Sequence, residues 1–278
     1  MPAALILGTF QYLPAFDVFR LSLTDRLLLR PVSSFIGLDN YQRLFADERF
    51  WNSVWNTIYF VGVSVPVQMA LALVLALGLA RKMRGVGVFR TVFFLPVVAS
   101  TVAVAVVWRW MYHPNIGILN YFLQLFELSP VRWLQDPTWA MPAVILLAVW
   151  SGVGYYMVIY LAGILDIPED YYEAARLDGA QRWHLFRYIT WPMLMPVTYL
   201  ILILQMINSF QVFTSVYVMT GGGPVRSTEV VVFYLYQRAF ESLEFGYASA
   251  ISVVLFVFLV TLTVVQRLTI GARVNYER

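Results

Sequence analysis

Six long stretches of this sequence contain no charged residue. The 278-residue chain has 19 lysine or arginine and 16 aspartate or glutamate residues, so evenly spread charges would leave gaps of roughly eight residues. The charge-free stretches are 1–16, 53–80, 91–108, 137–165, 188–225 and 245–266. A charge near the centre of a membrane-spanning helix costs about 2.5–3.5 kcal/mol, so stretches of this length indicate segments that cross a membrane. Because a helix satisfies its own backbone polar groups in lipid, we predict an all-α, polytopic membrane protein.

Composition excludes several function classes. Hydrophobic residues make up 60% of the chain and charged residues 13%, whereas a soluble domain has about 25% charged residues. This difference argues against a cytosolic enzyme. The absence of cysteine excludes disulfides, thiolate catalysis and cysteine metal sites, and the two histidines, His113 and His184, lie far apart. We therefore expect no catalytic residue, no metal site, no cofactor and no nucleic-acid partner.

The charge-free stretches predict six transmembrane helices. We place them at 3–23, 53–80, 88–111, 139–165, 193–219 and 247–269. Prolines within or at the start of these spans predict kinks, at Pro66, Pro96, Pro142 and Pro196. Outside the spans, residues 38–50 predict a short interfacial helix that begins with Asp39 or Asn40 as its cap.

The distribution of lysine and arginine predicts the orientation. Ten of them lie in segment 81–90, in segment 166–192 and in the C-terminal tail, whereas seven are spread over the longer loops of the other side. Positive charge favours the cytoplasm, so both termini are predicted to be cytoplasmic. Most tryptophans fall at the outer span ends, as expected of an aromatic belt, and Trp150 is the exception in mid-span.

The segment between the fourth and fifth spans, residues 166–192, predicts two short helices. Pro168 suits a first helical turn, and Gly179 suits a helix stop or a sharp reversal after Asp178 that needs a positive φ. A second helix is predicted over 180–190, ending before Pro192. On the residues alone, this segment also fits an ordinary solvated helical hairpin.

The residue pattern of this segment resembles the EAA loop of ABC importer permeases. The chain has Glu173-Ala174-Ala175, then Gly179, and then Ile189 and Pro192 at the spacing of that motif. Further stretches are similar to permeases of the carbohydrate-uptake (maltose-type) group: GLDNYQRLF at 37–45, RGVGVFRTVFFLP at 84–96, YVMTGGGP at 217–224 and FGYASAIS at 245–252.

This resemblance implies that residues 1–278 form one transmembrane domain of a type I ABC importer, with 166–192 as a cytoplasmic loop that couples it to a separate ATPase. The residues it implies for coupling are Glu173, Ala174, Ala175, Asp178 and Gly179. The chain itself is expected not to be an enzyme: its only lysine is Lys82, in ARKMRG, so it has no phosphate-binding P-loop.

The resemblance also implies the partners and the location. We expect a heterodimer with a second related permease, two copies of a cytoplasmic ATPase subunit, an extracytoplasmic solute-binding protein and the lipid bilayer. The location implied is the cytoplasmic membrane of a bacterium or archaeon. The solute implied is a sugar or sugar-like molecule: an oligosaccharide, a disaccharide or glycerol phosphate.

Polar and aromatic residues within the fourth and fifth spans are candidates for the solute path, because intramembrane polarity is a pointer to function. Stacking rings, neutral amides and hydroxyls suit a sugar. The candidates are Trp150, Tyr155, Tyr156, Gln205, Asn208, Ser209 and Gln211. Interhelical hydrogen bonds and cavity packing are the alternative role for the same side chains.

The outer segment Gly221-Gly222-Gly223-Pro224 lacks the lysine and the strand-to-helix setting of a phosphate loop. The resemblance implies a loop that faces the solute-binding protein, and a plain flexible turn is the alternative.

Two other classes of membrane protein compete with the importer. A secondary transporter driven by an ion gradient would show repeated halves and intramembrane carboxylates, and an intramembrane enzyme would need a catalytic dyad or a metal cluster. The sequence shows no internal repeat, no charged residue deep in a span and no intramembrane histidine, and the importer permease is therefore the favoured hypothesis.

Overall fold

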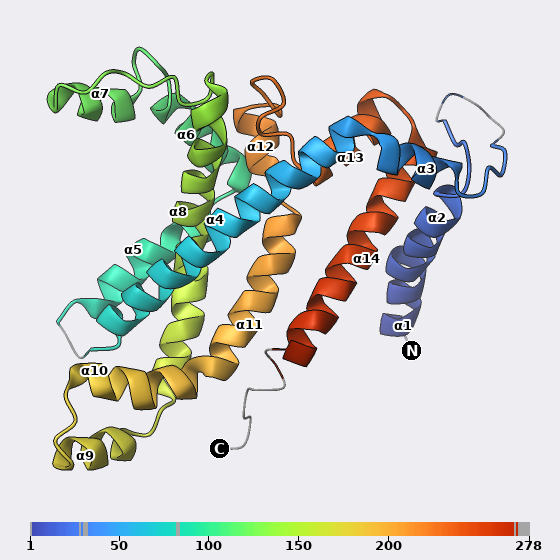
Figure 1. Cartoon of the computed structure of the whole chain (residues 1–278). Helices are drawn as coiled ribbons and strands as arrows, with labels where there is room; N and C mark the ends of the chain where they lie inside the picture. Colours follow the sequence, from blue (N-terminus) through green and yellow to red (C-terminus); the bar gives the residue numbers. More distant parts are fainter. Residues whose placement is uncertain (1, 28, 30–32, 82–83, 270, 272–278) are drawn as a thin grey trace.

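Helices make up the fold throughout the part of the chain that the structure describes. The computed structural model describes residues 2–27, 29, 33–81, 84–269 and 271 (Figure 1). Within these residues it has no strand, only one isolated bridge between Thr24 and Phe35. The predicted all-α class is confirmed.

The N-terminal helix lies beside the C-terminal one. It consists of three consecutive segments, α1 (Pro2–Leu7), the π-helical turn η1 (Gly8–Tyr12) and α2 (Leu13–Leu21). Its last part runs along α14 (Phe245–Thr269) at one side of the molecule (Figure 1). There the Phe19 ring meets the Phe256 ring edge-on, with centroids 5.8 Å apart.

A short helix, α3 (Asp39–Ala46), follows at the outer end, where a helix is predicted over 38–50. The predicted cap is wrong, because Leu38 occupies the N-cap position and makes no side-chain cap bond. The Asn40 side chain is instead buried, and its amide donates to the carbonyl oxygens of Ser22 at 2.8 Å and Thr24 at 2.9 Å. These bonds fix α3 to the end of α2.

Two long helices cross at the centre of the molecule (Figure 1). They are α4 (Glu48–Leu79) and α8 (Pro137–Leu165), and each begins at an aspartate whose carboxylate accepts a hydrogen bond from the first helical turn. Asp47 accepts from the N–H of Arg49 at 2.9 Å, and Asp136 accepts from that of Thr138 at 2.8 Å. Apolar side chains of both helices form the largest buried cluster.

The predicted third span is broken, so the prediction of one helix over 88–111 is wrong. Helix α5 (Val86–Val98) and helix α6 (Thr101–Met111) meet at an angle of 99°. Ala99 and Ser100 have extended backbone at the break. Pro96 weakens the preceding turn, because its ring nitrogen has no hydrogen to donate.

The first half of this broken span lies in direct backbone contact with α8. A Cβ atom placed on Gly154 would stand 2.0 Å from the carbonyl oxygen of Phe93. Only glycine permits this approach, which fixes α5 against the middle of α8.

The outer segment between α6 and α8 contains α7 (Ile118–Leu125), which projects sideways from the spans (Figure 1). Asn120 is buried, and its amide donates to the carbonyl oxygens of Pro114 and Val131, each at 2.9 Å. Its carbonyl oxygen accepts from the N–H of Val131 and from the indole of Trp133. One side chain therefore fixes the loop that returns to α8.

The fifth predicted span is interrupted, and the helix before it does not end where predicted. Helix α9 (Glu169–Leu177) is followed by α10 (Arg182–Leu185), the π-helical turn η2 (Phe186–Thr190), α11 (Trp191–Phe210) and α12 (Thr214–Met219). The chain stays helical through Pro192, because proline is tolerated in the first turn of a helix. The span predicted over 193–219 breaks instead at residues 211–213.

The outer end closes with α13 (Val231–Tyr236) and the π-helical turn η3 (Gln237–Glu241), which lead into α14. Among the described residues, four helical runs are long and apolar enough to span a membrane, or five if α5 and α6 count as one span. The four are Glu48–Leu79, Pro137–Leu165, Arg182–Met219 and Phe245–Thr269. The N-terminal helix, the remaining one of the six expected, is not among the runs that meet these criteria.

Candidate functional site

The predicted coupling residues lie together on a small helical projection. Glu173, Ala174 and Ala175 belong to α9, and together with α10 this helix forms one end of the molecule, remote from α7 and α13 (Figure 1). Glu173 and Ala174 are exposed and Ala175 is half-buried. Small side chains beside an exposed carboxylate allow another protein surface to approach the backbone closely.

The turn after α9 has the geometry predicted for it. Gly179 has a φ of +83°, a left-handed conformation that L side chains rarely adopt. Its N–H donates to the carbonyl of Arg176 at 3.0 Å, and the N–H of Ala180 donates to that of Ala175 at 2.9 Å. This pair of bonds is a Schellman motif, which satisfies the last carbonyls of α9 and reverses the chain.

Large apolar side chains are exposed on the same projection. Leu177 is 90% exposed at the end of α9, and Trp183 on α10 is 67% exposed. Both lie next to the Gly179 turn in sequence. Exposed apolar side chains on a charged projection are compatible with a protein contact at this end of the molecule.

The candidates for the solute path divide into buried and exposed residues. Gln205 is buried, and its amide donates to the carbonyl oxygen of Gln68 on α4 at 2.6 Å. Gln68 in turn donates to the carbonyl oxygen of Ala148 on α8 at 3.2 Å. This amide pair joins α4, α8 and α11 inside the protein, so Gln205 serves packing in this conformation.

Sequence reasoning missed Gln68. It is the only amide side chain between Thr57 and Ala80, in the middle of a charge-free stretch, and this was the available signal. Its closest approach to α8 is at Gly152, where a Cβ atom would stand 2.1 Å from the Gln68 amide nitrogen.

Three of the other candidates form a connected group on α8 and α11. Asn208 is exposed, and its amide donates to the hydroxyl of Tyr156 at 3.4 Å. The Tyr156 side chain is buried, and its ring meets that of Tyr155 edge-on with centroids 5.2 Å apart. Tyr155 is 41% exposed, so an amide and an aromatic ring are both accessible here.

Trp150 lies further along α8 and belongs to a row of aromatic side chains. It is 44% exposed, and its ring contacts that of Trp108 on α6 with centroids 5.4 Å apart.

The last two candidates lie at the outer end of α11. Ser209 is buried at the end of α11, and Gln211 is exposed at the break that follows. The seven candidates therefore do not form a single surface.

The outer glycine segment is an ordered turn. Thr228 accounts for much of this order, because its hydroxyl donates to the carbonyl of Gly223 at 2.8 Å and its N–H donates to that of Gly222 at 3.2 Å. Gly222 has a φ of +80°, and a Cβ atom there would stand 2.6 Å from the Phe233 ring. Gly221 is exposed and also has a positive φ, whereas Pro224 is half-buried.

A network of charged side chains at the outer end was not predicted. Arg49 at the start of α4 holds the buried carboxylate of Glu229, with Nε donating to Oε2 at 2.9 Å. Asp47 accepts hydrogen bonds from the hydroxyls of Tyr234 and Tyr247. Burial alone would raise the pKa of Asp47. The hydrogen bonds from these two hydroxyls and from the N–H groups of Arg49 and Phe50 lower it by more, so the pKa is below its ordinary value.

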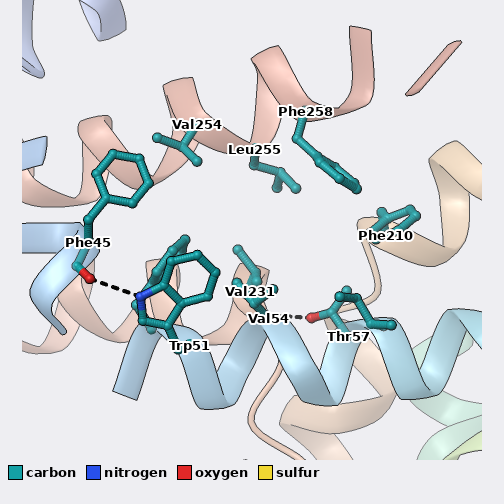
Figure 2. Close-up of a pocket in the computed structure, with 11 residues that line it drawn as sticks. Phe45, Trp51, Val54, Thr57, Phe210, Val231, Val254, Leu255 and Phe258 are labelled. Atoms are coloured by element: carbon teal, nitrogen blue, oxygen red, sulfur yellow. Dashed lines mark hydrogen bonds between the residues drawn. The ribbon is translucent and has the colours of Figure 1, made fainter. Parts of the chain in front are cut away.

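An apolar cavity lies elsewhere, between α4 and α14 (Figure 2). Its volume is about 320 Å³ and its lining is apolar, with rings such as Phe45, Trp51 and Phe258. The one hydroxyl in the lining, that of Thr57, accepts from the N–H of Val231 at 3.0 Å. A sugar needs several hydrogen-bond partners, so this cavity does not suit one.

The comparison with protein families decides between the classes of membrane protein. Residues 43–270 match the family described as the binding-protein-dependent transport system inner membrane component. The chain belongs to this family. The resemblance to ABC importer permeases is thereby confirmed, and the chain is a permease subunit of the ABC transporter class.

Relatives of this permease match it over nearly its full length. It is 38% identical to the "probable ABC transporter permease protein YurN" of Bacillus subtilis, over 95% of this chain and 91% of that protein. It is 35% identical to the trehalose/maltose transport system permease protein MalF of Thermococcus litoralis, over 95% of this chain and 90% of that protein.

The fold of the permease also occurs in a solved structure. A chain in the crystal structure of a bacterial ABC transporter "involved in the import of the acidic polysaccharide alginate" superimposes with a TM-score of 0.88. The match covers 99% of this chain and 94% of that one at 24% identity. The expected fold class of an ABC importer transmembrane domain is confirmed.

Proposed function

We propose that this permease is a non-catalytic transmembrane subunit of an ATP-driven importer of sugars or sugar-like solutes. The observation that carries the proposal is the projection of α9 and α10, which presents Glu173, Ala174 and Leu177 to solvent beside the Gly179 turn. On this projection Asp178 and Gly179 shape the surface, and Glu173 supplies a carboxylate for a cationic groove. A groove of a separate ATPase subunit is the partner that this surface fits.

The solute class rests on relatives and on side-chain chemistry. A relative that is 35% identical is a trehalose/maltose transport system permease. The accessible candidate groups on α8 and α11 are neutral: the Asn208 amide and the rings of Trp150 and Tyr155. Aromatic faces with neutral hydrogen-bonding groups suit a neutral saccharide better than an ion.

The proposed assembly contains a second related permease, two ATPase subunits and an extracytoplasmic solute-binding protein. One related transporter structure was determined in complex with an "alginate pentasaccharide-bound periplasmic protein", which supports a binding-protein partner. The ordered turn at Gly221, Gly222, Gly223 and Pro224 is at the outer end and is our candidate for facing that protein. We place both termini in the cytoplasm and the chain in the inner membrane of a bacterium or archaeon.

Charge reversal at Glu173 tests the coupling assignment. In the complex reconstituted with its ATPase, Glu173→Lys should weaken retention of the ATPase and lower its activity, because a cation would oppose a cationic groove. Glu241→Lys is the matched control, since Glu241 is an exposed carboxylate at the outer end. Wild-type ATPase retention and activity in Glu173→Lys would contradict the coupling assignment.

The same preparation separates the importer from an ion-gradient transporter. Transport by an ATP-driven importer should stop when ATP is removed and persist when the ion gradient is dissipated. The reverse pattern would support the secondary transporter.

A further inference from the structure

A hydrogen bond between two hydroxyl groups connects α9 to the turn that immediately precedes α11. The Tyr172 hydroxyl lies 3.0 Å from the Oγ1 atom of Thr190. Tyr172 stands in the first half of α9, and Thr190 is the last residue of the π-helical turn η2. Within the part of the chain that the structure describes, this is the only side-chain hydrogen bond between α9 and residues 182–210.

The Thr190 hydroxyl has a second possible partner. Its oxygen also lies 3.3 Å from the carbonyl oxygen of Leu185, which can only accept. When Thr190 donates its one hydrogen to Leu185, the Tyr172 hydroxyl is the donor to Thr190. Thr190 is 5% exposed and Tyr172 is half-buried, so both bonds are partly buried.

Thr190 also lies where the helix changes its geometry. In η2 the N–H of Trp191 donates to the carbonyl of Phe186, five residues earlier, instead of four. A wide turn of this kind is a common cause of helix bends, and the chain turns here from α10 into α11 (Figure 1). The Thr190 hydroxyl contacts the carbonyl oxygen of Leu185, the residue directly before this wide turn.

The two sides of α9 differ in exposure. Tyr172 and Ala175 are three residues apart, share one helical face and are half-buried, and Tyr172 makes the bond to Thr190. Glu173 and Ala174 are exposed and accessible to a partner. The bond to Thr190 therefore comes from the half-buried face of α9.

On the basis of the proposed function, we infer that Tyr172 is a positioning residue that transmits displacement of α9 to α11 through Thr190. The bond connects α9 directly to the turn from which α11 begins. At its other end α11 carries Asn208 and the break at 211–213, so a tilt at Thr190 is carried to the candidate solute path.

The test uses the complete importer, and the chain's lack of cysteine makes site-specific labelling straightforward. Spin labels at Gln211→Cys, directly after the outer end of α11, and at Leu146→Cys on α8 report the distance between these two positions. Distances are measured with and without MgATP and vanadate, together with ATPase retention. The variants are Tyr172→Phe, Thr190→Val and Thr190→Ser, and the control is Tyr171→Phe, because Tyr171 is exposed and next to Tyr172.

We expect MgATP and vanadate to shift the label distance in the wild type. In Tyr172→Phe and Thr190→Val, the ratio of shifted to unshifted complexes should fall about two- to tenfold, the equivalent of one hydrogen bond. ATPase retention should be unchanged. Thr190→Ser keeps the hydroxyl and should restore the shift, and Tyr171→Phe should match the wild type.

Each failure has a distinct meaning. If Tyr172→Phe shifts as fully as the wild type, or no more weakly than Tyr171→Phe, Tyr172 is not the transmitting residue. That result leaves the coupling assignment intact. If the wild-type complex neither retains the ATPase nor shifts, the proposed function itself is wrong.

Discussion

Arg49 and Glu229 form a two-pronged ion pair that joins segments 180 residues apart in the chain. Nε of Arg49 lies 2.9 Å from one carboxylate oxygen of Glu229 and Nη2 lies 2.5 Å from the other. The Glu229 side chain is 2% exposed, whereas that of Arg49 is 25% exposed. The start of α4 is thereby fixed to the segment that precedes α13.

We expect Arg49→Leu to destabilise the permease by about 3–5 kcal/mol, because it leaves the Glu229 carboxylate buried without a partner. Thermal unfolding of the purified protein in detergent measures the change. The double variant Arg49→Leu, Glu229→Leu should recover part of the loss, since no unpaired charge remains.

The more exposed ion pair between Arg43 and Glu244 shows how burial changes the loss of stability. Its N–O distance is 3.1 Å, but the Arg43 side chain is 49% exposed. Arg43→Leu should therefore cost about 1 kcal/mol or less. Equal losses in Arg43→Leu and Arg49→Leu would contradict the importance of burial.

Low pH should reduce the stability of the permease by protonating Asp47. Burial raises its pKa, but the hydrogen bonds from Tyr234, Tyr247 and the N–H groups of Arg49 and Phe50 together outweigh this effect and bring the pKa below the ordinary value of about 3.9. A lowered pKa in the folded state means that the stabilisation is complete above about pH 4 and is lost as pH falls through the folded-state pKa. Unfolding curves between pH 7 and pH 2.5 measure it. In Asp47→Asn the loss of stability below about pH 4 should be smaller than in the wild type. An unchanged loss in this variant would show that other carboxylates cause it.

Substitution at Gly179 should act on coupling and not on membrane insertion. A residue other than glycine pays about 1–2 kcal/mol for the left-handed conformation, and a β-branched one more. No atom lies within 4 Å of a Cβ placed there, so the whole effect within the chain is on the backbone. We expect Gly179→Val to lower ATPase stimulation sharply and Gly179→Asn, which tolerates this conformation, to lower it least. Normal stimulation in Gly179→Val would show that the turn is not needed for docking.

The amides of α11 should separate into transport and packing roles. Asn208→Ala should reduce uptake of the binding protein's ligand while the complex still assembles, because Asn208 is exposed. Gln205→Leu should instead lower thermal stability, since it removes the bond that joins Gln205 to Gln68. Wild-type uptake in Asn208→Ala would move Asn208 to the packing class.

The positions of the helices could be predicted from the sequence because lipid excludes charge along the whole length of a span. Each of the six charge-free stretches contains helix, although 91–108 and 188–225 are interrupted, and the Gly179 turn follows from local chemistry. A kink at Pro96 was predicted, but a full break of 99° between α5 and α6 was not, because Val98 and Thr101 are both compatible with a continuous apolar helix. Its direction depends on contacts with α8 that are distant in sequence.

The candidate site was predictable in its local parts only. The exposed face of α9 follows from a short motif, but the bond between Gln205 and Gln68 joins residues 137 positions apart. The contacts of Asp47 with Tyr234 and Tyr247 span still longer separations. Such pairs depend on how the helices cross, which no single segment specifies.

The contact between Gly154 and Phe93 limits how this permease can be redesigned. Any larger residue at position 154 would force α5 away from α8, since its Cβ would stand 2.0 Å from the Phe93 carbonyl oxygen. A mutant library aimed at a new cargo should therefore keep this position fixed. Diversity belongs at Trp150, Tyr155 and Asn208, whose side chains are accessible and whose replacement leaves the contact between α5 and α8 in place.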